Sequence, residues 1–319
     1  MKPIKLYFSG GCKGKSAKEE VELGVRNKLV SYFYPEQLES WFEISKGIEG
    51  SVMIDSGAYS AWTRGVEIDL GKYIEYCQEM IHRGKQEGKE VLVVNLDVIP
   101  GKKGQTRSLS KIRSPANISV IEEAAEKGYQ NLKKMIKAGL KPIHVFHQGE
   151  DWKWLHKMVE LTDYIGISPA NDLCVDARKK WIVSVFEYMY KHNIEVDTHG
   201  FGVWMSPILK SLPFTSCDAV SWMLLAAMGS INYPVGGFSN PDYSQIPHSL
   251  HVSARLSSKG LGKLTKEKLK MLEQDGYTYE DLQDWETRCR VNIRYFVEFE
   301  KWLNEYRKDK TFRPRPSLL

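Results

Sequence analysis

Short apolar runs recur along the first two thirds of the chain, and turn residues or segments of helical spacing separate them. The runs of this kind are residues 4–9, 28–33, 52–55, 91–97, 142–147, 164–168, 194–198 and 218–223. Apolar runs of this length, bounded by turn residues, indicate buried strands. A nearly continuous run such as 91–97 is typical of a parallel strand that is covered on both faces.

Helical spacing fills most of the gaps between these strands. Predicted helices cover residues 17–26, 35–44, 69–83, 118–138, 152–161, 175–191 and 206–212. Eight strands that alternate with helices predict an α/β fold, and a (β/α)8 TIM barrel fits better than an open doubly wound sheet. The chain contains neither Gly-x-Gly-x-x-Gly nor a phosphate-binding loop, which disfavours a Rossmann fold or a nucleotide hydrolase.

The composition changes after Gly229. Residues 230–262 are rich in Gly, Ser, Pro and Asn and predict an irregular segment, whereas 264–274 and 279–308 have helical spacing. We therefore predict a catalytic barrel over 1–229, with an irregular segment and C-terminal helices packed on it over 230–319. The last helix also carries basic residues, which favour a solvated helix face over a nucleic-acid contact: Arg288, Arg290, Arg294, Lys301 and Arg307.

The composition is that of a globular protein, with 42% hydrophobic and 27% charged residues. The absence of a long apolar run predicts no membrane span, and the first residues are typical of a strand rather than a signal peptide. The five cysteines are scattered without a Cys-x-x-Cys pair, which disfavours a disulfide framework or a sequence-local zinc cluster. These features predict a cytoplasmic protein.

The net charge of +5 is mild, but positive charge gathers in one predicted loop. This loop follows the strand 91–97, so we expect it at the rim of the barrel face that the strand ends form. Phosphate binding there is sensible, and a plain solvated loop is an equally good interpretation. Its basic residues are Lys102, Lys103, Arg107, Lys111 and Arg113.

Polar residues stand at the carboxyl ends of several predicted strands, which converge on one face of a barrel. Asp55, Asp97 and Asp218 are among them. A single Asp at a strand end is usually a cap or a loop anchor. Three carboxylates in one place repel each other and require a ligand or protons, so the sequence predicts a binding site at this face.

The same strand ends indicate a flat polar heterocycle with N–H donors as the ligand. Ionised Asp only accepts hydrogen bonds, and Gln148 offers both an acceptor and donors. The backbone of Gly166 permits close approach, and Tyr59 can stack on a ring. Guanine and its relatives match this demand.

Several segments resemble motifs of the tRNA-guanine transglycosylase superfamily, in the order in which that family has them. Asp-Ser-Gly-Ala-Tyr at 55–59 resembles the family's Asp-Ser-Gly-Gly-Phe/Tyr signature, and Asn-Leu-Asp at 95–97 resembles its base-reading strand end. His-Gln-Gly at 147–149, Tyr-Ile-Gly-Ile-Ser at 164–168 and His-Gly-Phe-Gly at 199–202 resemble later steps more loosely. Cys-Asp-Ala-Val-Ser-Trp at 217–222 resembles the run that carries the family's nucleophile.

The chain departs from this family in two respects. It lacks the family's Cys-x-Cys-x-x-Cys…His zinc site, and it is shorter than a bacterial tRNA enzyme. In both respects the chain resembles the zinc-less phage and bacterial DNA-guanine transglycosylases. This resemblance implies a pentosyltransferase that uses no cofactor or metal and inserts a 7-deazaguanine such as preQ0 into DNA, with tRNA as the alternative substrate.

The resemblance also implies roles for individual residues. Asp218 would be the nucleophile that forms a covalent glycosyl-Asp intermediate, and Asp55 would handle the proton of the base. The target base would have to leave its stack to enter the pocket. The residues expected to bind the base are Tyr59, Asp97, Gln148, Gly166, Ser168 and Gly200.

Two readings from other classes stay open. His144, His147 and His199, together with Asp55 or Asp218, could form the metal site of a barrel hydrolase. A His at a strand end is more often part of a structural hydrogen bond, so this reading is less favoured. A non-catalytic nucleic-acid binder would keep the basic loop and show no base exchange.

Overall fold

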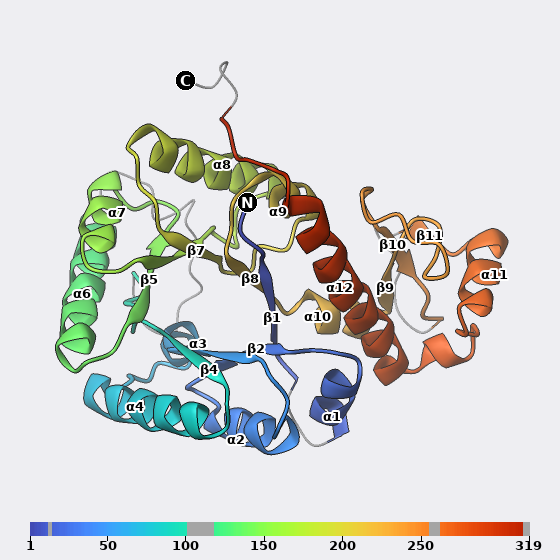
Figure 1. The fold of residues 1–319 in the computed structure, drawn as a ribbon, viewed down its shortest axis with the longest axis horizontal. Helices are drawn as coiled ribbons and strands as arrows, with labels where there is room; N and C mark the ends of the chain where they lie inside the picture. Colours follow the sequence, from blue (N-terminus) through green and yellow to red (C-terminus); the bar gives the residue numbers. More distant parts are fainter. Residues whose placement is uncertain (12–14, 101–117, 255–261, 315–319) are drawn as a thin grey trace.

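A closed barrel of parallel strands forms the centre of the protein (Figure 1). The computed structural model describes residues 1–11, 15–100, 118–254 and 262–314, and each structural statement below refers to these residues. Within them, eight strands close the barrel in chain order, with β8 beside β1. The strands are β1 (Lys5–Ser9), β2 (Asn27–Ser31), β3 (Ser51–Asp55), β4 (Glu90–Val94), β5 (Pro142–His147), β6 (Tyr164–Ser168), β7 (Asp197–Gly200) and β8 (Ser216–Ala219). The predicted (β/α)8 TIM barrel is confirmed.

Helices surround the barrel on its outside (Figure 1). They are α1 (Lys15–Glu22), α2 (Pro35–Ile44), α3 (Ala58–Thr63), α4 (Leu70–Gln86), α6 (Ile118–Lys137), α7 (Trp152–Val159), α8 (Val175–Lys191), α9 (Ser206–Ser211) and α10 (Ser221–Ala227). Aspartates cap two of them: Asp69 accepts the Lys72 N–H at 2.8 Å, and Asp151 accepts the Lys153 N–H at 2.8 Å. Each cap satisfies a backbone donor that the first helical turn leaves open.

The last strand lies earlier in the chain than the apolar pattern predicts. The prediction of a strand over 218–223 is wrong at its C-terminal end, because α10 begins at Ser221. The ladder between β1 and β8 ends where Phe8 pairs with Ala219. Trp222 therefore lies on a helix, and its indole N–H donates to the carbonyl of Ser9 at 3.0 Å.

The barrel interior is filled by side chains rather than open. The inward positions of the strands carry a separate buried apolar cluster of Tyr7, Met53, Val94, Ile143 and Val145. Beneath it, the Tyr7 hydroxyl and the Ser51 hydroxyl lie 2.6 Å apart. A filled interior restricts ligand access to the carboxyl-end mouth, as is usual for this fold.

The segment after α10 contains a small second sheet, which the prediction of an irregular segment did not include. In the described residues β9 (Ser230–Tyr233) pairs antiparallel with β10 (His248–His251), which pairs parallel with β11 (Gly262–Lys263). These strands have four residues or fewer and lie among Gly, Ser and Pro, so their apolar pattern is too short to recognise. α11 (Lys266–Gln274), a short 3-10 helix (Asp281–Gln283) and α12 (Trp285–Arg307) follow.

The final helix, α12, packs against the first strand of the barrel. The Leu6 N–H donates to Glu300 Oε1 at 2.9 Å, and the Ile4 N–H donates to Asn304 Oδ1 at 2.7 Å. β1 pairs with β2 only at Phe8 and Ser9, so side chains of α12 satisfy the remaining backbone donors at this edge. α12 therefore completes the ring of helices around the barrel (Figure 1).

Two basic residues of α12 are buried, so the prediction of a solvated or nucleic-acid-binding face is wrong for them. Arg288 donates to the carbonyls of Ala226 at 2.9 Å and of Leu282 at 2.8 Å. Arg307 is fully buried and donates to the carbonyl of Phe214 at 2.8 Å. Buried guanidinium groups with carbonyl partners hold loop backbones in place. No helix in the described residues combines the length and apolarity needed to cross a membrane.

Candidate active site

Three carboxyl groups meet at the carboxyl-end mouth of the barrel, as the strand ends predict. Asp55 is the last residue of β3, Asp97 lies three residues after β4, and Asp218 lies in β8. Burial raises the pKa of Asp55 to about 7, with further increases from the charges of Asp97 and Asp218, although backbone N–H groups of Gly57 and Ser56 oppose the shift. Asp55 can therefore carry a proton near neutral pH.

Asp218 is held by donors on both carboxylate oxygens. The Ser9 hydroxyl donates to Oδ2 at 2.8 Å, and the Gly202 N–H donates to Oδ1 at 2.8 Å. Ser9 ends β1 and Gly202 follows β7, so the two strands on either side of β8 orient this carboxylate. These supporting contacts join residues that lie far apart in the chain, and the sequence pattern does not show them.

His199 lies directly beneath Asp218. Its Nε2 is 3.5 Å from Asp218 Oδ1, and its Nδ1 is 2.5 Å from the Ser216 hydroxyl. The Tyr164 hydroxyl lies 2.6 Å from the same Ser216 oxygen. The His199 ring is fully buried and packs edge-on against Phe201. The sequence pattern predicted His199 as a metal ligand or as a structural hydrogen-bonding group, and the structure adds its contact with the Asp218 carboxylate.

Asp97 is paired with a histidine of the neighbouring strand. Its Oδ2 lies 3.3 Å from His147 Nε2, and the other ring nitrogen of His147 lies 3.1 Å from Glu150 Oε1. Burial by itself would lower the pKa of His147, but the charges of Asp97 and Glu150 and their hydrogen bonds raise it to about 9. Sequence reasoning overlooked Glu150, although its three-residue spacing from a strand-end histidine was a usable signal.

Gln148 and Ser168 lie side by side at the ends of β5 and β6. The Gln148 N–H donates to the Ser168 carbonyl at 3.0 Å, and Gln148 Oε1 accepts the Ala170 N–H at 3.0 Å. The side-chain oxygen of Gln148 is therefore engaged by the protein. Its amide nitrogen is the atom that can donate to an acceptor on a ligand.

The two glycines predicted to contact the base have different surroundings. A Cβ at Gly166 would lie 2.5 Å from Phe201 Cε2, so this glycine makes room for the Phe201 ring over the barrel interior. A Cβ at Gly200 would lie 2.8 Å from Val203 and 3.0 Å from Phe214, which belong to the outer core. The structure therefore does not bring the open side of Gly200 to the mouth.

Tyr59 lies on a helix that the apolar pattern does not predict. Gly57, with a φ of 73°, directly precedes α3, and Tyr59 lies in the first turn of that helix. The Tyr59 side chain is 53% exposed, and its ring stacks on Trp62 with centroids 6.2 Å apart. An exposed ring at the entrance can cover a flat ligand with little rearrangement.

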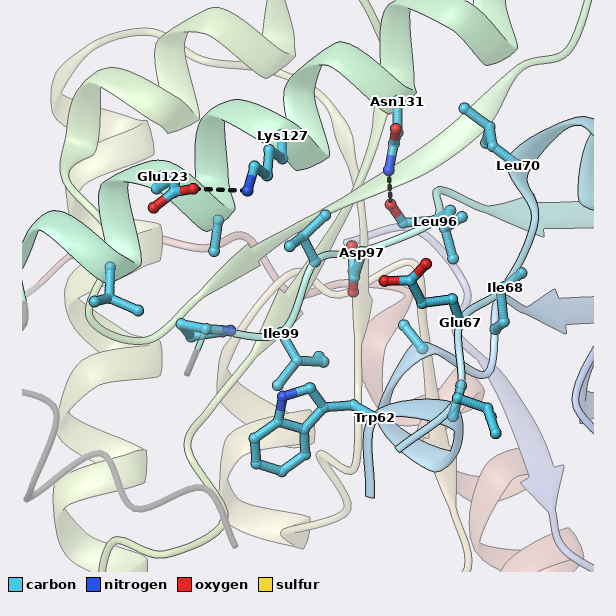
Figure 2. A pocket seen from close by; sticks show the side chains of 17 residues that line it. Trp62, Glu67, Ile68, Leu70, Leu96, Asp97, Ile99, Glu123, Lys127 and Asn131 are labelled. Atoms are coloured by element: carbon cyan, nitrogen blue, oxygen red, sulfur yellow. Dashed lines mark hydrogen bonds and ion pairs between the residues drawn. The ribbon is translucent and has the colours of Figure 1, made fainter. Parts of the chain in front are cut away.

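A pocket of about 470 Å³ opens beside Asp97, between α3, the segment before α4, and α6 (Figure 2). Figure 2 shows the carboxylates of Asp97 and Glu67 turned toward the middle of this pocket, with the Trp62 indole along one side. Lys127 and Glu123 form an ion pair of 2.6 Å at its edge. The volume is in the range of small-ligand sites, and the sequence did not indicate this pocket.

No described contact supports the predicted phosphate-binding loop or the alternative metal site. The basic residues Lys102, Lys103, Arg107, Lys111 and Arg113 lie outside the described residues. In the part of the chain that the structure describes, no three His, Cys, Asp or Glu side chains are grouped so that they could hold a metal ion. His147 and His199 instead contact one carboxylate each at the mouth.

Comparisons with known proteins do not identify a family. No protein-family model matches the chain, and no curated protein matches it. The likeness to guanine transglycosylases therefore stays a prediction that depends on the motifs and on the geometry of the mouth.

Proposed function

We propose that this protein is a pentosyltransferase that exchanges guanine in nucleic acid, preferably DNA, for a 7-deazaguanine such as preQ0. The observation that carries the proposal is the contrast between two carboxyls at one mouth. Burial raises the pKa of Asp55 to about 7, so that it can gain or lose a proton near neutral pH, whereas both oxygens of Asp218 are oriented by hydrogen-bond donors. Paired carboxyls in different environments are the usual arrangement for separate proton-transfer and nucleophilic roles.

The reaction divides one displacement into two. An Asp218 oxygen bonds to C1′ of the target nucleoside as the bond from C1′ to guanine breaks, and Asp55 gives its proton to the departing base. The incoming deazaguanine then loses a proton to Asp55 and bonds to C1′, which releases Asp218. The two steps restore the protein, and retaining glycosidases use a carboxylate nucleophile in the same way.

The remaining side chains at the mouth suit base recognition. Asp97 accepts N–H groups, Gln148 donates through its amide nitrogen, and Tyr59 stacks on the base. Ser168 ends β6 and Gly166 lies two residues before it, and both are proposed contacts, Gly166 through its backbone because Phe201 fills the space beside it. Gly200 ends β7 and stays a proposed backbone contact, although the space that its missing side chain leaves faces Val203 and Phe214.

Incubation with radiolabelled guanine or preQ0 and duplex DNA, single-stranded DNA or tRNA tests the proposal. We expect label to enter DNA. Label in tRNA alone would identify the tRNA enzyme, the second reading in this class. Nucleic-acid binding without incorporation of label would identify a non-catalytic binding protein. A hydrolytic activity that chelators abolish would favour a metal-dependent hydrolase. Label in none of the three nucleic acids would overturn the proposal.

A second experiment tests the nucleophile. Nucleic acid incubated with the protein and no incoming base should form a covalent adduct that Asp218→Ala abolishes. Asp176→Asn, on the exposed N-terminal turn of α8, provides a control that should retain the adduct. An adduct with Asp218→Ala would show that another residue is the nucleophile. Guanine exchange in the nucleic acid of a cell would agree with the predicted cytoplasmic location. It would also agree with the resemblance to phage and bacterial DNA-modifying enzymes.

A further inference from the structure

His147 is held between two carboxylates, one on each ring nitrogen. Nε2 lies 3.3 Å from Asp97 Oδ2, and Nδ1 lies 3.1 Å from Glu150 Oε1. A neutral imidazole has a single N–H, whereas ionised carboxylates only accept hydrogen bonds. Donation to both carboxylates together needs two ring N–H groups, which only the imidazolium form has, so the geometry favours a positive charge on His147.

A tight turn fixes Glu150 against His147. The Glu150 N–H donates to the His147 carbonyl at 3.1 Å, and the His147 N–H donates to Glu150 Oε2 at 3.0 Å. Gly149 between them has a φ of 113°, which other residues rarely adopt. The Asp97, His147 and Glu150 side chains are only 14%, 15% and 11% exposed. Solvent therefore screens these interactions weakly.

The described neighbours of His147 other than Asp97 and Glu150 are uncharged, so the charge on His147 acts mainly on these two carboxylates. His144, on the same strand, accepts the Asn95 amide N–H on Nδ1 at 2.9 Å, and burial lowers its pKa, so it is neutral. Opposite His147 in the ladder, β6 presents the uncharged Ser168. The charges that face His147 are thus those of Asp97 and Glu150. Asp97 contacts a cation, whereas the hydrogen bonds to the Asp55 side chain come from backbone N–H groups.

We propose that His147 and Glu150 form a charged clamp that holds the Asp97 carboxylate in place as an acceptor for the base and leaves proton transfer to Asp55. His147 and Glu150 are positioning residues, since they act on the base through Asp97. The use of the proton in base exchange rests on the proposed function, whereas the clamp itself does not.

The titration of His147 tests the clamp without any measurement of activity. NMR of protein labelled at the histidine ring carbons follows each imidazole, and the signal lost in His147→Gln identifies His147. We expect His147 to titrate near pH 9, and Glu150→Gln to lower that pKa by about one unit or more. Glu87→Gln is the matched control, because Glu87 pairs with Arg83 at 2.9 Å at the C-terminal end of α4 and has no contact with His147 among those described. A His147 pKa at or below 6.5, or one unmoved by Glu150→Gln, would overturn the clamp.

Exchange kinetics test the consequence for Asp97. In Glu150→Gln, His147 loses its charge at lower pH, so we expect KM for the incoming base to rise about tenfold from a correspondingly lower alkaline pH, with a smaller change in kcat. An unchanged pH profile and KM would overturn the link between the clamp and base recognition. Absence of exchange in the unaltered protein would instead refute the proposed function, and the His147 titration would still decide the clamp.

Discussion

Ser9 in the first strand of the barrel donates its hydroxyl to Asp218 in the last strand at 2.8 Å, across 209 residues of sequence. The contact lies at the seam where β1 and β8 close the barrel. Closure of the fold and orientation of the candidate nucleophile therefore depend on the same pair of strands.

Substitution Ser9→Ala should lower the rate of adduct formation about 10- to 100-fold, because a hydrogen bond to a charged group is worth roughly 1.5–3 kcal/mol. The ladder between β1 and β8 remains, so the midpoint of thermal unfolding should change little. Ser211→Ala, on the exposed side of α9, is the control and should leave adduct formation unchanged. An unaltered adduct rate in Ser9→Ala would show that Asp218 does not need this donor.

Substitution Asp55→Asn should abolish exchange and make the protein more stable at pH 8. The folded-state pKa of Asp55 is raised from 3.8 to about 7. Folding thus favours the protonated carboxyl, and its contribution to stability is lost as pH rises through that window. The loss is about 4 kcal/mol at most, since each pKa unit corresponds to about 1.4 kcal/mol. Thermal unfolding should show a larger gain for Asp55→Asn at pH 8 than at pH 4.5, and an equal gain at both pH values would contradict this.

Glu300 should show the same sign of pH dependence without an effect on exchange. Burial raises its pKa from 4.5 to about 7, although the Leu6 N–H opposes the shift. Glu300→Gln retains an acceptor for Leu6 and removes the charge. We expect it to raise the unfolding midpoint at pH 8, to change it little at pH 4.5, and to leave the exchange rate within about twofold, since surroundings far from a site couple weakly to it. Loss of exchange would show that α12 influences the mouth.

Substitution Gly166→Ala should destabilise the protein by roughly 1–3 kcal/mol, the usual range for an overpacked core. The new Cβ would lie 2.5 Å from Phe201 Cε2, so the ring must move. Gly128→Ala is the matched control, because its Cβ would meet His144 at an ordinary 3.5 Å. That change should stabilise α6 by up to about 1 kcal/mol. Urea denaturation measures both, and a neutral Gly166→Ala would mean that Phe201 is free to rearrange.

Much of the architecture could be predicted from local pattern. The bounds of β5, β6, α2 and α8 agree with the apolar and helical spacing. The strand at β8 was placed too late, because the alternation continues into a helix that packs on α12. The short strands after α10 were missed for the opposite reason, since they carry too few apolar residues to form a period.

The candidate site shows the same division. The strand-end position predicted Asp55, Asp97 and Asp218, because parallel strands of a barrel present their carboxyl ends on one face. The same rule placed Gly200 at the mouth, whereas side-chain alternation turns its open side toward Phe214. Strand ends alone do not say which face of the barrel wall a residue occupies.

The sequence by itself determined the order of the barrel strands and of the longer helices between them, the barrel, and the carboxylates at its mouth, because these depend on local periodicity and on a rule of parallel sheets. Only the tertiary structure decided what surrounds each carboxylate. Ser9 orients Asp218, and Glu150 and His147 hold Asp97, whereas burial raises the pKa of Asp55 to about 7. Those differences arise from contacts between distant segments and from burial, neither of which is encoded in the spacing of neighbouring residues.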